Sequence, residues 1–300
     1  MRPIQFIKEK LFKHLSFKQI NRLRKIKWIF YSLFINDARD IKRFHSNELE
    51  IVIIEHLVPI FLKDSQPTLL DIGANIGGYS YYLAPLIAKF NGQCIAFEPR
   101  LNIYQRLKKN VICNNFTAER LALSNVNGFF NLYLPTSHGC SSFIYRPEFE
   151  GLTTEEVPVS KLDDYVKNNG IKAIGFIKID VEGHEIEVIE GAVHTIQEFH
   201  PILLCESEDR YIRHSGKSTQ MFIDIMIKLN YQVYVISKKK LKILPIEEIT
   251  IPKEKHGQDE YFYNYWFFPK HLDKQLLDFF NNCLKKIIIE NDTIMIRSES

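Results

Sequence analysis

The sequence predicts an α/β fold in which a mostly parallel sheet is covered by helices on both faces. Short apolar runs bounded by turn residues, such as 67–73 and 93–99, indicate buried strands. Segments with apolar side chains at helical spacing separate these runs. Parallel neighbours need crossover connections, so this alternation of strand and helix predicts the fold class. The 300 residues are enough for one large domain with appendages or two small domains.

The first half of the fold is expected to begin with a helix over residues 47–63. Asn47 is its candidate N-cap, Glu50 follows three residues on, and Pro59 should bend it. Strands and helices then alternate along the chain. We expect strands at 67–73, 93–99 and 118–124, and helices at 76–90 and 101–111.

The second half continues this alternation after two additional strands, 128–135 and 155–162, which flank a loop. In order, we expect a strand at 174–180, a helix at 184–197, a strand at 201–206, a helix at 218–229 and a strand at 231–236. Residues 261–268 form a closing strand and residues 271–288 a final helix in this prediction.

Composition and cysteine usage exclude several classes of protein. The net charge of +3 is too weak to indicate nucleic-acid binding. No two of the five cysteines are spaced as C-x-x-C, which disfavours a disulfide framework or a zinc site and favours a reducing compartment. The apolar run at 28–35 is much shorter than a membrane-spanning helix, and no signal peptide is recognisable. We therefore expect a cytoplasmic protein.

A candidate ligand site follows the first two strands. In parallel sheets, ligands bind beyond the carboxyl ends of strands, where the strand order reverses. Asp71, Gly73 and Asn75 follow the first strand, and Glu98 follows the second, where an acid can accept both hydroxyls of a ribose. The turn reads G-x-N-x-G-G, and Asn75 replaces the glycine that a dinucleotide needs near its pyrophosphate. This favours S-adenosylmethionine over NAD.

Six segments together resemble the FkbM family of S-adenosylmethionine-dependent methyltransferases, in order and in spacing. They are "DIGANIGGYS" (71–80), "FEPR" (97–100), "LALSNVNG" (121–128), "KLDDY" (161–165), "FIKIDVEGHEIEVIEGA" (176–192) and "PILLCE" (201–206). The resemblance covers about residues 67–210. It implies the class I methyltransferase fold, with a seven-stranded sheet that contains one antiparallel strand, for which 261–268 is the candidate. It also implies O-methylation of a hydroxyl, often on a sugar of a glycan, polysaccharide or secondary metabolite.

The resemblance also assigns cofactor contacts. The methionine part of S-adenosylmethionine would be lined by Asp71, Gly73, Ala74, Asn75 and Gly77. Glu98 would bind the ribose, and Ala122 and Leu123 would contact the adenine. Asp180 would face the cofactor and the acceptor together.

The segment after the fourth parallel strand supplies the candidate catalytic residues Asp180, Glu182 and His184. His184 is the first candidate for the base, because a helix start favours its neutral form. The alternative is a capping or solvated histidine. A second alternative is a divalent-metal site made by all three side chains, although their spacing does not fit one helix face. We expect Glu185, Glu187 and Glu190 on a solvated helix face, and Glu206 as a reserve acid for acceptor hydroxyls.

The domain organisation that we predict has three parts. Residues 1–45 form a basic helical extension, 46–268 the methyltransferase domain, and 269–300 a C-terminal helical extension. Residues 1–27 carry nine basic side chains and one acidic one, so the extension either packs on the domain or contacts an anionic membrane surface.

Three other functions stay open from the sequence: a metal-assisted methyltransferase, an NAD-dependent oxidoreductase, and an inactive cofactor-binding homologue. The loop at 135–151 offers His138, Ser141, Ser142, Tyr145 and Arg146 as contacts for a sugar. The sequence leaves the acceptor and the oligomeric state open.

Overall fold

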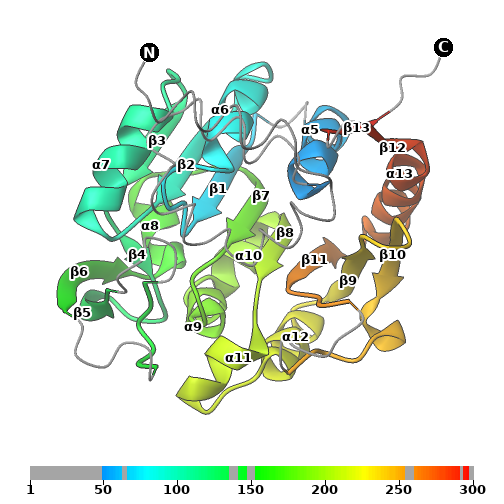
Figure 1. Cartoon of the computed structure of the whole chain (residues 1–300). Coiled ribbons are helices and arrows are strands. Elements are labelled where there is room, and N and C mark those ends of the chain that lie inside the picture. Colours follow the sequence, from blue (N-terminus) through cyan, green and yellow to red (C-terminus); the bar gives the residue numbers. More distant parts are fainter. Residues whose placement is uncertain are drawn as a thin grey trace, which may run out of the picture.

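The structure is a computed structural model that describes residues 49–62, 66–134, 141–146, 153–253, 260–290 and 293–296. The predicted N-terminal extension, the candidate cap Asn47 and His138 of the loop lie outside these ranges. The centre of the molecule is an eight-stranded sheet in the order β10-β9-β11-β8-β7-β1-β2-β3 (Figure 1).

Five neighbouring strands of this sheet form parallel pairs. They are β1 (Thr68–Ile72), β2 (Gln93–Phe97), β3 (Phe116–Glu119), β7 (Ile174–Ile179) and β8 (Ile202–Glu206). The other three are β9 (Tyr231–Ser237), β10 (Lys242–Pro245) and β11 (Asn264–Pro269). Strand β11 is antiparallel to both neighbours, β8 and β9. The predicted fold class is confirmed, and β10 adds an eighth strand by pairing antiparallel with β9 at the edge.

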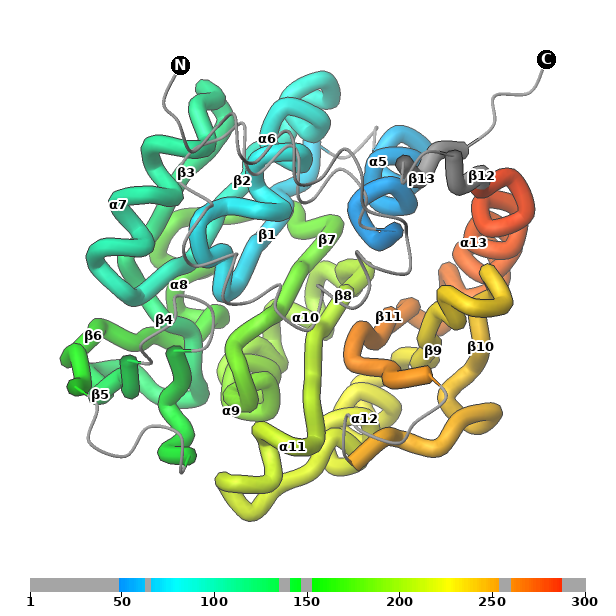
Figure 2. Tube along the Cα trace, in the orientation of Figure 1, coloured from blue at the N-terminus to red at the C-terminus, as the bar shows by residue number. Residues whose placement is uncertain are grey.

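Helices cover both faces of the sheet (Figure 1). The helices on one face are α5 (Leu49–Phe61), α6 (Ser80–Ala88), α7 (Leu101–Asn110) and α13 (Asp273–Lys286). Those on the other are α8 (Leu162–Asn168), α9 (Glu185–Glu190), α10 (Val193–Phe199) and α12 (Thr219–Lys228). Although α5 and α13 are far apart in the sequence, they lie side by side (Figure 2).

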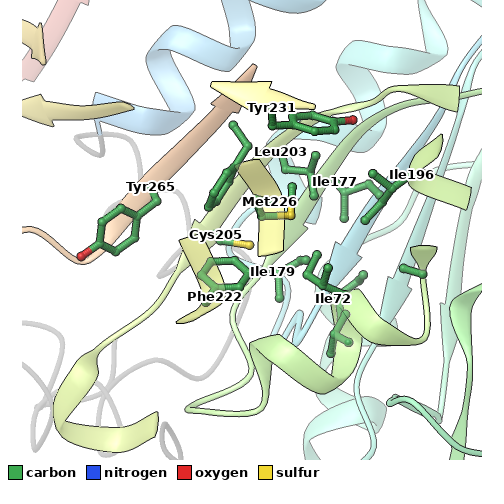
Figure 3. Packing of buried hydrophobic residues seen from close by; sticks show 14 of the residues in the cluster. Ile72, Ile177, Ile179, Ile196, Leu203, Cys205, Phe222, Met226, Tyr231 and Tyr265 are labelled. Carbon is green, nitrogen blue, oxygen red and sulfur yellow. The ribbon is translucent and has the colours of Figure 1, made fainter. Parts of the chain in front are cut away.

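The two faces make two hydrophobic cores because successive side chains of a strand point to opposite sides. In β7, Ile177 and Ile179 lie in the first core, against α10 and α12. Figure 3 shows them packed with Phe222 and Met226. Phe176 lies in the second core, against α5, α6 and α13. By the same alternation, Lys178 faces the second side, where a lysine is unexpected.

The region predicted as one strand over 118–124 is divided between two sheets. Strand β3 ends at Glu119, and β4 (Ala122–Leu123) joins a three-stranded sheet with β5 (Gly128–Tyr133) and β6 (Thr154–Ser160). The expected strands at 128–135 and 155–162 are therefore confirmed, and they pair with each other antiparallel.

The helix predicted over 184–197 is also divided, into α9 and α10. Gly191 lies at the break, and a Cβ atom there would be 2.0 Å from the carbonyl oxygen of Ser124. The break brings the backbone after β4 against the backbone between the two helices.

The prediction of a helical extension over 269–300 is wrong for its last part. After α13 the chain forms a hairpin of β12 (Ile287–Glu290) and β13 (Thr293–Ile296). Its many β-branched residues favour strands over a helix. Two short helices, α11 (Asp209–Ile212) and η2 (Arg213–Ser215), follow β8, and η3 (Ile246–Glu248) follows β10. Within the described ranges, no helix combines the length and apolar content needed to cross a bilayer.

Candidate functional site

The site lies where the strand order of the sheet reverses. From β1 the chain continues to β2 and β3 on one side, and it later continues through β7 and β8 on the other. The ends of β1 and β7 are joined by a hydrogen bond from the Asp180 amide to the Ile72 carbonyl, at 2.9 Å. Because ligands bind outside the carboxyl ends of strands at such a point, segments 71–80 and 176–192 form the candidate site.

Gly73 is required by the contact between these two strand ends. Its φ is +79°, and a Cβ atom would lie 1.8 Å from the carbonyl oxygen of Asp180. No side chain fits in that space, so the backbones of the two segments approach directly. The amides of Gly73 and Ala74 both donate to the Phe97 carbonyl, which also fixes the turn to β2.

The following residues hold a tight turn. Asn75 has a left-handed φ of +51°, and its side-chain oxygen accepts a hydrogen bond from the Ile76 amide at 2.8 Å. Gly77 has a φ of +95°, and a Cβ atom there would lie 2.7 Å from Cγ2 of Val111. Gly77 is therefore explained by packing against the end of α7.

Asp71 stabilises this turn through hydrogen bonds to Ser80. The side chain is buried, and its Oδ2 accepts hydrogen bonds from both the amide and the hydroxyl of Ser80, the first residue of α6. Burial raises the pKa of Asp71, and the Ser80 hydrogen bonds and Lys178 oppose the shift. Through Oδ2, Asp71 therefore holds the start of α6 and the turn that precedes it.

Glu98 follows β2 and is held by two backbone amides. Its Oε2 accepts from the Asn75 amide at 3.1 Å, and its Oε1 accepts from the Arg100 amide at 2.9 Å. Burial raises the pKa of Glu98 to about 7, against the effect of these two amides. A carboxylate has about four lone-pair positions, so two amides leave positions for hydroxyl donors. The arrangement suits the ribose contact predicted from the sequence.

The predicted adenine contacts are mostly buried. Ala122 and Leu123 form β4, and Leu123 belongs to the first core. The next residue, Ser124, is buried as well, and its hydroxyl lies 3.0 Å from Nε2 of His184. This segment therefore connects the predicted cofactor side of the site with His184.

Asp180 is the most accessible of the three predicted catalytic residues, with a side chain that is 35% exposed. Its Oδ2 lies 3.5 Å from Nζ of the buried Lys178. Burial lowers the pKa of Lys178, but Asp180, Glu206 and Asp71 raise it more, so the net shift is upward. Lys178 is therefore a buried cation that forms an ion pair with Asp180, and the charges of Asp71 and Glu206 also favour its ionised form.

Glu182 lies with Asp180 in a small pocket beyond β7 and β8. Its φ of +56° is left-handed, and its Oε2 is 3.9 Å from Nη1 of the buried Arg146. Burial and the neighbouring Asp180 raise the pKa of Glu182 well above its ordinary range, against the effect of Arg146. The pocket is lined by Asp180, Glu182, Gly183, Glu185, Glu206, Glu208 and Tyr211.

His184 lines a different hollow from Asp180 and Glu182. It precedes α9, makes no side-chain cap, and is 6% exposed. Aromatic residues Phe130, Tyr133, Phe143 and Tyr145 line the same groove. Burial lowers the pKa of His184, although Glu187 opposes the shift, so the ring is held neutral near pH 7.

A family profile described as "Methyltransferase FkbM domain" matches residues 71–234. The match contains both strand-end segments of the site and more than half of the chain. The chain belongs to the FkbM methyltransferase family.

Three curated relatives match this FkbM chain. Methyltransferase sdnD from Sordaria araneosa is 26% identical over 172 residues, with coverage of 47% of this chain and 66% of sdnD. Hexuronic acid methyltransferase AglP from Haloferax volcanii is 24% identical over 147 residues, with coverage of 48% of this chain and 58% of AglP. The 2-O-methyltransferase NoeI from Sinorhizobium fredii is 27% identical over 152 residues, with coverage of 45% of this chain and 61% of NoeI. The chain thus spans less than two thirds of the length of each.

Solved structures with similar folds have low sequence identity to this chain. Methyltransferase FkbM from Methylobacillus flagellatus KT is 17% identical, with coverage of 67% of this chain and 43% of that one and a TM-score of 0.41. The O-methyltransferase from Bacillus cereus in complex with SAH is 11% identical, with coverage of 80% and 94% and a TM-score of 0.43.

The metal alternative finds no support in the geometry of this FkbM domain. In the described ranges, no three His, Cys, Asp or Glu side chains lie together as metal ligands. Two consecutive residues with positive φ, Glu182 and Gly183, turn the chain between Asp180 and His184. Asp180 and Glu182 therefore share one pocket while His184 lines the other.

Sequence reasoning missed the side chains that support the site. Glu185, expected on a solvated helix face, is 1% exposed, and Glu187 forms an ion pair with Lys217 at 2.7 Å. Ser80 and Lys178 were not singled out, although a lysine between isoleucines in a buried strand is a recognisable signal. The burial of Glu185 could not be read from its helical position, because residues distant in sequence cover it.

Proposed function

We propose that this FkbM protein is an S-adenosylmethionine-dependent O-methyltransferase that acts on a hydroxyl of a sugar or a similar polyhydroxylated acceptor. The observation that carries the proposal is the Glu98 carboxylate, which the Asn75 and Arg100 amides hold beside the switch point of the sheet. Two relatives support the acceptor class: AglP is named for a hexuronic acid and NoeI for 2-O-methylation.

The turn after β1 favours S-adenosylmethionine over a dinucleotide. A dinucleotide fingerprint needs a glycine at its second position so that the backbone can reach the pyrophosphate. Here Asn75 occupies that position, and its amide is committed to Glu98. S-Adenosylmethionine has no phosphate, so this turn costs it nothing, while Glu98 still has acceptor positions for the ribose hydroxyls.

When bound, S-adenosylmethionine supplies an electrophilic methyl group for an in-line displacement. The chain must align the acceptor oxygen with that methyl, and alignment can lower the barrier by about 7–11 kcal/mol. Gly73 and Asp180 fix the two strand ends against each other, which makes the position of Asp180 rigid. We assign Asp180 to accept the hydrogen bond of the acceptor hydroxyl.

His184 is the competing candidate for the base. Its lowered pKa suits a base, but Nε2 already contacts the Ser124 hydroxyl and Nδ1 lies 3.5 Å from Glu187. A proton on its way to His184 would pass through Ser124. If Asp180 accepts the proton, the Asp180 variant should be slow. If His184 is the base, the His184 variant should be slow.

The function is tested by adding the protein and S-adenosylmethionine with a tritiated methyl group to a lysate of cells that lack this protein. The species that becomes labelled identifies the acceptor. With that acceptor, Asp180→Asn should lower turnover roughly 10²–10⁴-fold, the usual size of a general acid–base contribution, with little change in cofactor affinity. A slow His184→Ala with a fast Asp180→Asn would move the base to His184. Cofactor binding with no labelled product would indicate an inactive homologue.

A further inference from the structure

The acidic pocket beyond β7 and β8 contains more carboxyl groups than basic partners for them. Three of its five carboxylates have a basic partner: Asp180 with Lys178 at 3.5 Å, Glu182 with Arg146 at 3.9 Å, and Glu208 with Arg210 at 2.7 Å. The other two have no ion pair among the residues that the structure describes. They are Glu185 and Glu206.

Glu185 gives a second, independent indication of a ligand. Its side chain is 1% exposed, and its Oε1 accepts a hydrogen bond from the Gly183 amide at 2.9 Å. Its Oε2 is buried and has no hydrogen-bond donor in the described part of the chain. A buried carboxylate oxygen without a donor is costly, so this atom has the chemistry of a binding contact.

Basic groups surround the pocket but do not reach this oxygen. Lys178 donates to the Ile179 carbonyl at 3.1 Å, and Arg210 makes two hydrogen bonds to Glu208, at 2.7 and 2.9 Å. The guanidinium of Arg146 lies over the ring of Tyr211 at 4.1 Å. In the described part of the chain, no basic side chain donates to Glu185 Oε2, so this atom is available to a cationic donor of a bound molecule.

We propose that the methyl acceptor carries a cationic amino group, as an amino sugar does, and that this group binds Glu185 and Glu206 in the pocket. The inference rests on the proposed function, because it describes the acceptor side of the same site. An ammonium group has three donors and no acceptor, which matches carboxylate oxygens in a small pocket. An acidic sugar would bring a further carboxylate to this pocket and would gain no ion pair with Glu185 or Glu206.

The pKa values of these two carboxyl groups agree with this proposal. Burial raises the pKa of Glu185 to about 7, and burial together with Asp180 raises that of Glu206 well above its ordinary range. A cation within about 4–6 Å would stabilise the ionised forms and release the protons.

The test compares glucosamine, N-acetylglucosamine and glucuronate as probes, measured by ligand-observed NMR with saturating S-adenosylhomocysteine. Saturating S-adenosylhomocysteine keeps the binding site of the cofactor's own amino group occupied, so glucosamine cannot bind there. Glucosamine should bind about tenfold or more tightly than its acetylated form, the effect of one hydrogen bond to a charged group. Glu185→Gln should remove the preference for glucosamine, while the glutamine carbonyl can still accept the hydrogen bond from the Gly183 amide. Glu206→Gln should lower the preference. Glu198→Gln, on an exposed helix face, is the matched control.

Equal binding of the amine and its acetylated form, or tighter binding of glucuronate, would overturn the proposal. So would a glucosamine preference that disappears once S-adenosylhomocysteine is added, because the cofactor amine would then occupy the pocket. Failure of S-adenosylhomocysteine to bind, with the glucosamine preference intact, would overturn the proposed cofactor but support the amine pocket.

Discussion

Replacing Gly73 by Ala should separate the ends of β1 and β7. The new Cβ would lie 1.8 Å from the Asp180 carbonyl oxygen, so one of the two segments must move. The left-handed φ of +79° adds about 1–2 kcal/mol for any residue with a side chain. Overpacking of a dense site adds typically ~1–3 kcal/mol, so the free energy of unfolding should fall by roughly 2–5 kcal/mol. Because Gly73 is expected to line the methionine part of the cofactor, its displacement should lower cofactor affinity as well.

Gly170→Ala is the matched control for this prediction. Gly170 has a φ of +62°, but a Cβ atom there meets nothing within 4 Å, so it carries the conformational cost without the clash. Urea unfolding gives the stability of both variants, and calorimetry gives their affinity for S-adenosylmethionine. A Gly73→Ala protein as stable as Gly170→Ala, with unchanged cofactor affinity, would refute the close approach of the two strand ends.

Three further predictions concern the support of the site. Ser80→Ala removes one of the donors to the buried Asp71 and should lower the free energy of unfolding in urea by about 1–3 kcal/mol; an unchanged midpoint would contradict this role. The folded protein holds a proton on Glu98, whose pKa is about 7, that the unfolded chain releases near pH 4.3. Stability should therefore fall as pH rises from about 4.5 to 7, by roughly 3 kcal/mol at most, and less in Glu98→Gln; an identical pH profile would count against it. Gly191→Ala places a Cβ atom 2.0 Å from the Ser124 carbonyl oxygen and should cost about 1–3 kcal/mol in the same unfolding assay; wild-type stability would show that the backbone yields there.

The sheet could be predicted from the sequence because its signals are local. Buried parallel strands are short apolar runs, and 67–73 and 174–180 were recognised as β1 and β7 from these runs alone. The edge strand β10 was missed, since a four-residue edge strand, Lys242–Pro245, has too few residues to show a period. The hairpin after α13 was missed because the helical prediction was extended over residues whose β-branched side chains favour strands.

The candidate site could be predicted only in part because its geometry depends on backbone turns. The spacing of Asp180, Glu182 and His184 suggested a common site, but two positive φ values in succession send His184 toward Ser124. Gly73 was expected to line the cofactor, and the structure adds a separate reason for a glycine there, which is the close approach of the Asp180 carbonyl. Contacts of this kind join segments about a hundred residues apart, and no local pattern in the sequence records them.

The most direct test of the proposed cofactor site is calorimetric titration of the protein with S-adenosylmethionine, with NAD as the comparison. We expect saturable binding of S-adenosylmethionine and no binding of NAD. Glu98→Ala should weaken binding about tenfold or more, since it removes a charged acceptor for the ribose hydroxyls. Binding of NAD, or S-adenosylmethionine affinity unaffected by Glu98→Ala, would contradict the assignment of this strand end as the cofactor site.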